Sequence, residues 1–129
     1  MEKIQVVLAL INTESGKHIV VHRKNEDNYG FPGGKVKIGE SRLQALFREL
    51  DEETGLVGFK NDSFELINIQ KRIQDDKEIE LSTFGCTLIL TDNVPLFSAE
   101  SHIEPMLMEP SKFYQLTKFK DFYKNLFPN

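Results

Sequence analysis

The segment between residues 41 and 55 constrains the fold most, because it carries the start, the buried face and the end of one helix. Ser41 and Gln44 stand three residues apart, as in a capping box that satisfies the first free N–H groups of a helix. Gly55 follows the last helical position, where glycine adopts the left-handed conformation without steric cost. The apolar residues between these ends form one buried stripe, made of Leu43, Leu46, Phe47 and Leu50. The sequence therefore predicts a helix over about residues 42–53.

Apolar, β-branched stretches flank this helix on both sides. Residues 3–11 and 17–23 are rich in valine, isoleucine and leucine, and the turn-like residues between them predict a hairpin. After the helix, residues 64–73 and 78–91 alternate as two strands about a turn at residues 75–77. Residues 103–108 form one more short strand. These strands favour a sheet that packs against the helix.

The remaining segments complete the expected fold. Residues 24–29 are polar and residues 30–34 are glycine-rich, so both are expected to be irregular. From Phe113 onward the apolar spacing becomes helical, with a stripe made of Leu116, Phe119, Phe122, Tyr123 and Leu126. We expect this C-terminal helix to pack on the core, with a homodimer surface as the alternative. The order of elements predicts an α/β sandwich with one mixed sheet and a helix on each side.

Size and charge limit the functional classes. A chain of 129 residues and 14.9 kDa has the size of one domain, so we expect residues 1–129 to share a single core. The net charge of −4 and the pI near 5.4 argue against a broad basic surface for a nucleic-acid polymer. They leave a nucleotide substrate open.

Cysteine content and hydropathy bear on the compartment. Cys86 is the single cysteine, which excludes an intrachain disulfide and a cysteine-based zinc cluster and suits a reducing compartment. The longest apolar run near the start, residues 6–11, is too short to span a bilayer and lacks the flanks of a signal peptide. We expect a soluble, cytoplasmic protein without a membrane partner.

One side of the predicted helix is strongly acidic. Glu49, Glu52 and Glu53 stand at helical spacing, so their carboxylates meet in one patch, with Cβ atoms roughly 5–6 Å apart. The patch lies to the side of the apolar stripe, neither buried nor facing bulk water. Such a face is usually only solvated, but here Gly33 and Gly34 precede the helix and allow a close backbone approach to a metal or phosphate. Hard oxygen ligands select Mg²⁺, Mn²⁺ or Ca²⁺ over zinc.

The spacing of these residues resembles a known family motif. Gly34, five residues, Glu40, seven residues and then Arg48-Glu49-Leu50-Asp51-Glu52-Glu53-Thr54-Gly55-Leu56 match the Nudix box, G-x5-E-x7-R-E-U-x-E-E-x-G-U, where U is aliphatic. The Pro-Gly-Gly sequence that usually precedes the box is present as residues 32–34. The chain resembles a compact, MutT-like Nudix hydrolase. The resemblance implies an α/β/α sandwich with a central mixed sheet and Mg²⁺- or Mn²⁺-dependent hydrolysis of a nucleoside diphosphate linked to another group.

The resemblance also implies roles for single residues. Glu49, Glu52 and Glu53 look like the metal ligands, with the Gly33 carbonyl as an additional one, while Arg48 and Glu40 hold the loop and the helix in register. Their opposite charges also suggest an ion pair. Glu52 or a loop residue would accept the proton of the attacking water. In MutT-like proteins a further glutamate often lies in a late loop, where Glu100 falls, with Glu104 as the alternative and surface glutamates as the plain interpretation.

Four residues are candidates for substrate contact. Arg23 ends a strand where MutT-like proteins often contact a phosphate or a base, although an exposed strand-end arginine explains it equally well. Phe31 is placed to flank a base or only to pack, and Gly34 and Lys35 belong to the glycine-rich loop.

Within the resemblance, several functions stay open. The compact build favours a (d)NTP pyrophosphohydrolase that releases a nucleoside monophosphate and pyrophosphate. ADP-ribose and dinucleoside polyphosphate hydrolases are the alternative enzymes, and a non-catalytic nucleotide-binding module is the alternative of another class. All box carboxylates are present, which favours the enzyme.

Other motifs are rejected. The sequence from Gly30 to Lys35 lacks one residue and the Ser or Thr of a P-loop. His18 and His22 lie roughly 13 Å apart along a strand, so they are expected to be surface residues and not metal ligands. Cys86 lies in an apolar strand and is expected to belong to the core.

Overall fold

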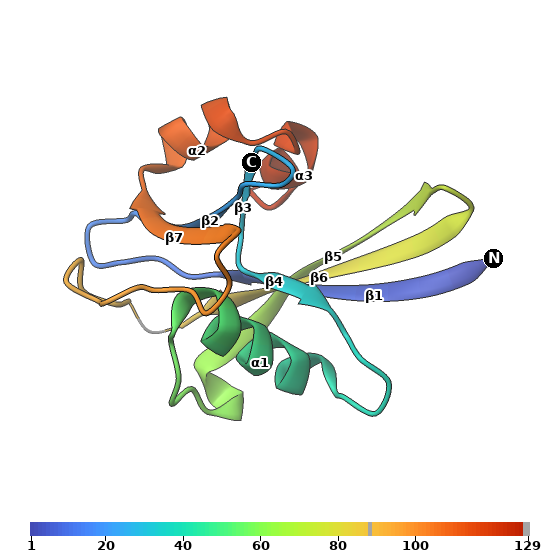
Figure 1. The fold of residues 1–129 in the computed structure, drawn as a ribbon, viewed down its shortest axis with the longest axis horizontal. Helices are drawn as coiled ribbons and strands as arrows, with labels where there is room; N and C mark the ends of the chain where they lie inside the picture. Colours follow the sequence, from blue (N-terminus) through green and yellow to red (C-terminus); the bar gives the residue numbers. More distant parts are fainter. Residues whose placement is uncertain (88, 128–129) are drawn as a thin grey trace.

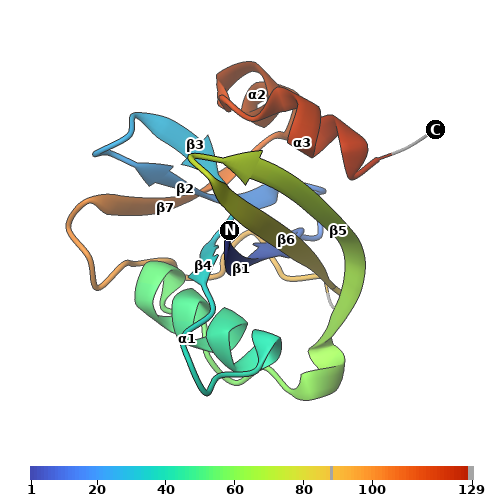
Figure 2. The same ribbon diagram turned by 90° about the vertical axis from the view of Figure 1, so that its right-hand side faces the viewer.

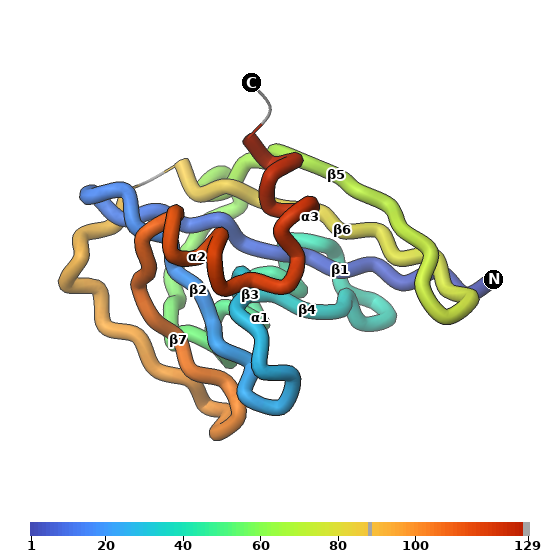
Figure 3. Tube along the Cα trace, turned by 90° about the horizontal axis from the view of Figure 1, so that it is seen from above, coloured from blue at the N-terminus to red at the C-terminus, as the bar shows by residue number. Residues whose placement is uncertain are grey.

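The computed structural model describes residues 1–87 and 89–127, in which seven strands form two sheets. Helix α1 (Arg42–Thr54) covers one side, and the short helices α2 (Pro110–Leu116) and α3 (Lys120–Asn125) lie on the other (Figure 1; Figure 2). Seen from above, α2 and α3 cross the upper face of the sheets (Figure 3). No helix of the described residues is long and apolar enough to cross a membrane.

The larger sheet is mixed, as predicted. It holds β4 (Gly33–Lys35), β1 (Glu2–Leu10), β6 (Lys77–Cys86) and β5 (Phe64–Gln74), in that order. β1 pairs with β6 in parallel, and the other two pairings are antiparallel. The expected turn between β5 and β6 is confirmed, with Asp75 and Asp76 at positive φ. β6 ends earlier than the predicted strand 78–91, of which residue 88 lies outside the described residues.

The strand predicted over residues 17–23 forms β2 (His18–Arg23) but does not continue a hairpin with β1. β2 belongs to a second, antiparallel sheet, between β3 (Asn28–Gly30) and β7 (Ile103–Met108). The hairpin contact is limited to the turn, where the Ile19 N–H donates to the Ile11 carbonyl at 3.0 Å. Ile11 and Ile19 are both fully buried, so the chain passes from one sheet to the other through the core.

The segment from residue 24 to 34, expected to be irregular, contains the short strands β3 and β4. Gly33 makes β4 possible, because a Cβ at this position would lie 1.9 Å from the Val7 carbonyl oxygen on β1. The φ angle of Gly33 is +151°, a value that residues other than glycine rarely adopt. Glycine therefore permits a strand here instead of preventing one.

The single C-terminal helix predicted from residue 113 onward is wrong, because the chain breaks between α2 and α3. Thr117 is extended, its Oγ1 accepts the Phe119 N–H at 3.2 Å, and the Lys118 N–H donates to the Asn28 side chain at 2.9 Å. These local and tertiary hydrogen bonds replace those of a continuous helix. Leu116 and Phe119 consequently stay 39% and 45% exposed instead of joining the core.

The predicted helix is confirmed as α1, and it covers the first of two apolar cores. The capping box of Ser41 and Gln44 is present, and Gly55 is left-handed with φ of 76°. Ala45, Leu46 and Leu50 pack with residues of the mixed sheet, which include Val7, Ala9, Phe64 and Phe84. A second core joins β2 to α2 and α3 through Val20, Phe31, Phe113 and Tyr123. Phe31 belongs to the second core and Val36 packs against the first, so the double glycine (Gly33 and Gly34) lies between the two cores. We call residues 33–40, from the double glycine to Glu40, the box loop.

Candidate active site

The double glycine of β4 lies directly against the acidic face of α1. The Gly33 N–H donates to the Glu53 carboxylate at 2.9 Å. A Cβ on Gly34 would approach the Glu49 carboxylate to 2.7 Å, so this carboxylate fills the space beside the Gly34 backbone. The sequence predicted that the glycines permit a close backbone approach to a metal or phosphate, and in this structure the groups beside them are the carboxylates of Glu53 and Glu49.

Glu53 differs from the expected half-exposed position, because only 3% of it is accessible to solvent. Arg23, a predicted substrate contact, donates to its carboxylate at 2.6 Å and to the carbonyls of Phe31 and Gly33, each at 3.2 Å. The helical spacing that grouped the three glutamates could not indicate that the end of β2 would lie beside Glu53. Burial of a carboxylate is costly unless it is paired, and Arg23 together with the Gly33 N–H supplies that pairing.

Arg48 connects the box loop to the helix. Its guanidinium donates to both oxygens of Glu40, at 2.7 and 3.0 Å, and to the Lys35 carbonyl at 3.0 Å. This is the ion pair that the charges of Glu40 and Arg48 predict. The hydrogen bond from Arg48, followed by one from the Lys37 N–H, lowers the pKa of Glu40 to about 2. The loop is therefore held to α1 by a bidentate, charge-assisted contact.

The same arginine also neutralises the acidic face. Arg48 lies 2.6 Å from the Glu49 carboxylate and 3.5 Å from that of Glu52. Burial is the main cause that raises the pKa of Glu49, and the nearby Glu53 and Glu52 charges raise it further, while the hydrogen bond from Arg48 opposes them. Of the three predicted ligands, Glu52 is the most open, with 38% of its side chain exposed.

The donor chemistry at this face suits a hard divalent cation, but the side chains are paired with arginines. Among residues 1–87 and 89–127, no group of three acidic, histidine or cysteine side chains is arranged to hold a metal. Glu53 is bound to Arg23, and Glu49 and Glu52 face Arg48. Carboxylate oxygens and the Gly33 carbonyl are nevertheless the ligand types that Mg²⁺ prefers.

A pocket of about 510 Å³ opens beside the double glycine. All four predicted substrate contacts line it, namely Arg23, Phe31, Gly34 and Lys35. Its apolar wall comes from β1 and β6, and its far side from the break between α2 and α3, through Ile4, Val6, Leu8, Ile79, Leu81, Thr117, Phe119 and Phe122. Phe31 itself is buried, and its ring stacks on that of Phe113 with the ring centres 5.0 Å apart. Phe31 therefore forms part of the floor of the pocket. The volume lies within the range of small-molecule sites, about 300–1,000 Å³.

Comparison with known proteins agrees with this geometry. The family model described as the NUDIX domain matches residues 2–129. The chain belongs to the NUDIX domain family. Among solved structures, a MutT protein from Methanosarcina mazei Go1 superposes with a TM-score of 0.77 over 97% of this chain and 93% of that one, at 23% identity. That similarity concerns the fold.

Two curated relatives of this NUDIX chain are enzymes by name. The chain is 35% identical over 60 residues to the 8-oxo-dGTP diphosphatase of Escherichia coli (strain K12), a match that covers 43% of this chain and 46% of that protein. It is 39% identical over 66 residues to the 8-oxo-dGTP diphosphatase of Haemophilus influenzae, covering 48% of each. The chain thus spans about half the length of the curated relatives it matches.

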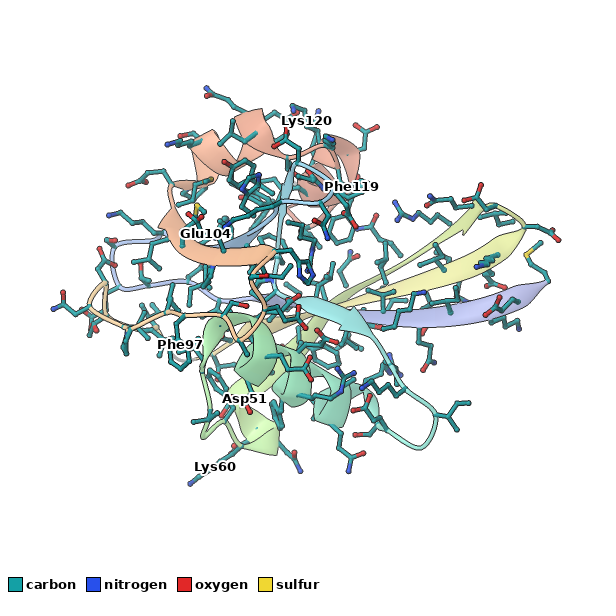
Figure 4. All side chains as sticks on the ribbon, viewed as in Figure 1. Asp51, Lys60, Phe97, Glu104, Phe119 and Lys120 are labelled. Carbon is teal, nitrogen blue, oxygen red and sulfur yellow. The ribbon has the colours of Figure 1, made fainter. Side chains whose placement is uncertain are left out.

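The loop that carries Glu100 is attached to the end of α1. The Phe97 N–H donates to the Thr54 carbonyl at 3.1 Å, and the Ala99 N–H donates to the Glu52 carbonyl at 2.9 Å. The Glu100 carboxylate lies 3.6 Å from His102 and is 39% exposed. These backbone hydrogen bonds hold the loop against the last turn of α1, and Figure 4 shows Phe97 beside that helix.

Glu104, the alternative to Glu100, lies elsewhere. It belongs to β7, where its carboxylate is 3.7 Å from the Lys24 ammonium and 55% exposed (Figure 4). In the described part of the chain, its side chain forms no hydrogen bond or ion pair with α1. Of the two late glutamates, the geometry therefore favours Glu100.

His18 is not the surface residue that the strand spacing suggested. Only 3% of it is exposed, and its ring nitrogens bond to the Asn12 side chain at 2.6 Å and to the Tyr123 hydroxyl at 2.5 Å. Burial lowers the pKa of His18 to about 4. His22 is partly exposed and stacks on Tyr29 at 4.4 Å. Cys86 is half-buried against the first core, as expected.

Sequence reasoning missed Asn28, Arg72, Thr117 and Phe119, which also line the pocket. Asn28 and Arg72 lie on β3 and β5, and the other two lie at the break between α2 and α3. The alternation along β5 could have placed Arg72 on one face of the sheet. It could not have indicated which face the C-terminal segment covers.

Proposed function

We propose that this NUDIX chain is a Mg²⁺-dependent pyrophosphohydrolase that converts (d)NTP to a nucleoside monophosphate and pyrophosphate. The observation that carries the proposal is the continuity between the acidic face of α1, the double glycine and the pocket, with Gly33 and Gly34 common to the glycine loop and the pocket wall. The names of the two 8-oxo-dGTP diphosphatases support a nucleoside triphosphate as substrate.

Glu49, Glu52, Glu53 and the Gly33 carbonyl would hold the cation, Mg²⁺ or, as the alternative, Mn²⁺. When bound, such an ion polarises phosphoryl oxygens and lowers the pKa of the attacking water. Arg23 and Arg48 form ion pairs with the carboxylates that would face it. Arg23 and Lys35 line the same pocket and would compensate the charge of the polyphosphate.

The reaction needs a group that accepts the proton of water. Glu52 is the most exposed of the three box glutamates, and Glu100 lies on the loop that is hydrogen-bonded to the end of α1. Both are carboxylates at the edge of the acidic face, so either would accept that proton. Hydrolysis of ADP-ribose or a dinucleoside polyphosphate, and nucleotide binding without catalysis, are the alternative functions. Homodimer formation and a cytoplasmic location stay predictions.

A metal-depletion assay tests the proposal. Turnover should require Mg²⁺ or Mn²⁺ and should rise toward alkaline pH, because the nucleophile must lose a proton. Millimolar Mg²⁺ should also raise the melting temperature, since a ligand that binds only the folded state stabilises it. Full turnover after exhaustive chelation would contradict the metal assignment.

A substrate panel tests the substrate class. The panel should contain the common dNTPs, 8-oxo-dGTP, ADP-ribose and a dinucleoside polyphosphate, with identification of the products. We expect a dNTP to give the highest kcat/KM, with pyrophosphate as product. A higher kcat/KM for ADP-ribose or the dinucleoside polyphosphate would favour the alternative enzymes, and binding without turnover of any compound would favour the binding module.

A further inference from the structure

A second, smaller pocket adjoins the first on the side of α3. It has a volume of about 380 Å³ and shares Arg72, Leu81, Phe119 and Phe122 with the wall of the larger pocket. The shared residues show that the two pockets lie side by side, and we call the pair the groove, which runs from the double glycine to α3. The proposed function uses only the first part of this groove.

The second pocket is basic in a chain whose net charge is negative. Its cationic lining residues are Lys71, Arg72, Lys118 and Lys120, against the single acid Asp121. Gln70 and Arg72 on β5 face the α2–α3 segment, so the side chain of Lys71 between them points to the other face of the sheet, and three cations face the pocket. Within the described ranges, none of these four cations has a carboxylate within 4.0 Å. The Lys118 ammonium donates to the Glu26 carbonyl at 2.8 Å, and that of Lys120 donates to the Thr117 carbonyl at 2.8 Å. Neutral carbonyls orient the lysines but leave their charge uncompensated.

Phe119 and Arg72 stand between the two parts of the groove. The Arg72 guanidinium lies 5.2 Å from the centre of the Phe119 ring, within cation–π range, which holds both side chains at the junction. Phe119 is the last residue of the turn between α2 and α3, and Lys120 begins α3 (Figure 4). This turn is held to the sheets, because the Lys118 N–H bonds to Asn28 and the Gln70 amide donates to the Phe122 carbonyl at 3.3 Å. The junction is therefore formed before any ligand binds.

We propose that the basic pocket binds a second phosphate of the substrate, attached to the nucleoside on the side away from the pyrophosphate bond. The inference rests on the proposed function, in which the reacting phosphates lie at the double glycine beside Arg23 and Lys35, and it places the nucleoside in the rest of the larger pocket. A group on the far side of that nucleoside then enters the smaller pocket, where Arg72, Lys118 and Lys120 favour a dianion. The substrate class is a nucleoside phosphorylated at both ends, with a 5′-polyphosphate and a 3′-phosphate.

Equilibrium binding tests this without any hydrolysis. Calorimetric titrations compare a nucleoside 5′-monophosphate with the corresponding nucleoside 3′,5′-bisphosphate, neither of which contains a pyrophosphate bond. In the unmodified protein the 3′-phosphate should tighten binding about tenfold, the effect of a charge-assisted hydrogen bond. The gain should shrink as salt rises, because the lysines are solvent-accessible.

Variants locate the effect. Arg72→Gln, Lys118→Gln and the double variant should bring the ratio of the two dissociation constants toward one. Lys124→Gln is the matched control, because this lysine lies on α3 but lines neither pocket, and it should keep the ratio. Circular dichroism checks that each variant is folded. If Arg72→Gln does not fold, the ratio of dissociation constants measured with Lys118→Gln tests the inference.

Three results would overturn the inference: equal affinities for the two ligands in the unmodified protein, a ratio that survives in the folded double variant, or its loss in the Lys124→Gln control. A further titration measures the binding of a 5′-phosphorylated dinucleotide. If the dinucleotide binds tighter and the bisphosphate does not, the pocket takes a second nucleoside, and the phosphate assignment is wrong. Failure of the proposed function is distinct, because it shows as absence of turnover for every 5′-polyphosphate while the binding ratio persists.

Discussion

At the scale of single residues, the two adjacent glycines have different tasks. The missing Cβ of Gly33 leaves room for the Val7 carbonyl on β1, which is rigid backbone. The missing Cβ of Gly34 leaves room for the Glu49 carboxylate, the end of a flexible side chain. Gly33 therefore maintains the packing of the sheet, and Gly34 maintains the position of a proposed metal ligand.

The two glycine-to-alanine variants should separate these tasks. Gly33→Ala should lower the free energy of unfolding by at least about 2 kcal/mol, because a backbone contact of 1.9 Å must be relieved. Gly34→Ala should melt near the unmodified protein but lose on the order of a hundredfold in turnover, since small displacements of catalytic groups are costly. Thermal melts and steady-state assays check both. Equal melting temperatures would contradict the assignment of Gly33.

Glu52 and Glu53 are neighbours in sequence but differ in burial. Glu53→Gln should reduce turnover and also cost about 2 kcal/mol of stability, because it leaves the Arg23 guanidinium without its buried partner. Glu52→Gln should reduce turnover with little change in stability, because its carboxylate is partly exposed and its contact with Arg48 is long. Chemical denaturation alongside turnover distinguishes the two variants. A Glu53→Gln protein as stable as the Glu52→Gln protein would argue against the buried pair.

At the scale of elements, the late loop acts as a cover for the end of α1. Residues 97 and 99 take the free carbonyls of the last helical turn, and the Phe97 ring lies where a Cβ on Gly55 would be, with a closest approach of 2.7 Å. Gly55 therefore has two roles: it adopts the left-handed conformation that ends α1, and its missing side chain leaves room for the Phe97 ring. Attachment of the loop keeps Glu100 near the acidic face.

Glu100 and Glu104 form a matched pair for testing this loop. Glu100→Gln should lower kcat by roughly a hundredfold with little change in KM while chemistry limits the rate, as expected for a proton acceptor. Glu104→Gln should leave turnover unchanged, because its carboxylate faces Lys24, which follows β2 in the second sheet. Steady-state kinetics of both single variants and of the double variant show whether Glu100 is the proton acceptor. Unimpaired turnover of the double variant would leave the proton acceptor within the helix.

At the scale of the whole molecule, one buried histidine joins distant parts of the chain. His18 on β2 bonds to Asn12 before that strand and to Tyr123 on α3, 105 residues away in sequence. It also packs edge-on against Phe31 and Phe113 in the second core. Because the ring is neutral inside this cluster, the stability of the arrangement depends on pH.

Folding stability should fall between pH 6.5 and about 4. The pKa of His18 is about 4 in the folded state and near 6.5 when unfolded, so the unfolded chain binds the extra proton in this window. The stabilisation is complete above pH 6.5 and is lost as the pH falls, by about 3 kcal/mol at most. Denaturation at several pH values measures the slope. His18→Gln should flatten it, while His22→Gln, whose ring reaches solvent, should not.

The local sequence alone determined several secondary-structure elements and the contacts within the motif. Capping residues and apolar spacing define α1, because a helix is specified by contacts within one or two turns. Alternation along the chain predicted β5 and β6, although β6 ends earlier than expected. The box residues predicted the glycine approach and the pairing of Glu40 with Arg48, since both depend on one loop and the helix that follows it.

Only the tertiary structure decided the rest, because those contacts join residues far apart in sequence. The burial of Glu53 depends on Arg23, which arrives from the other sheet. The break at Thr117 depends on Asn28, and the burial of His18 depends on Tyr123. The groove is formed by strands and a C-terminal turn that no local pattern brings together, so its basic end beside α3 became visible only in the folded chain.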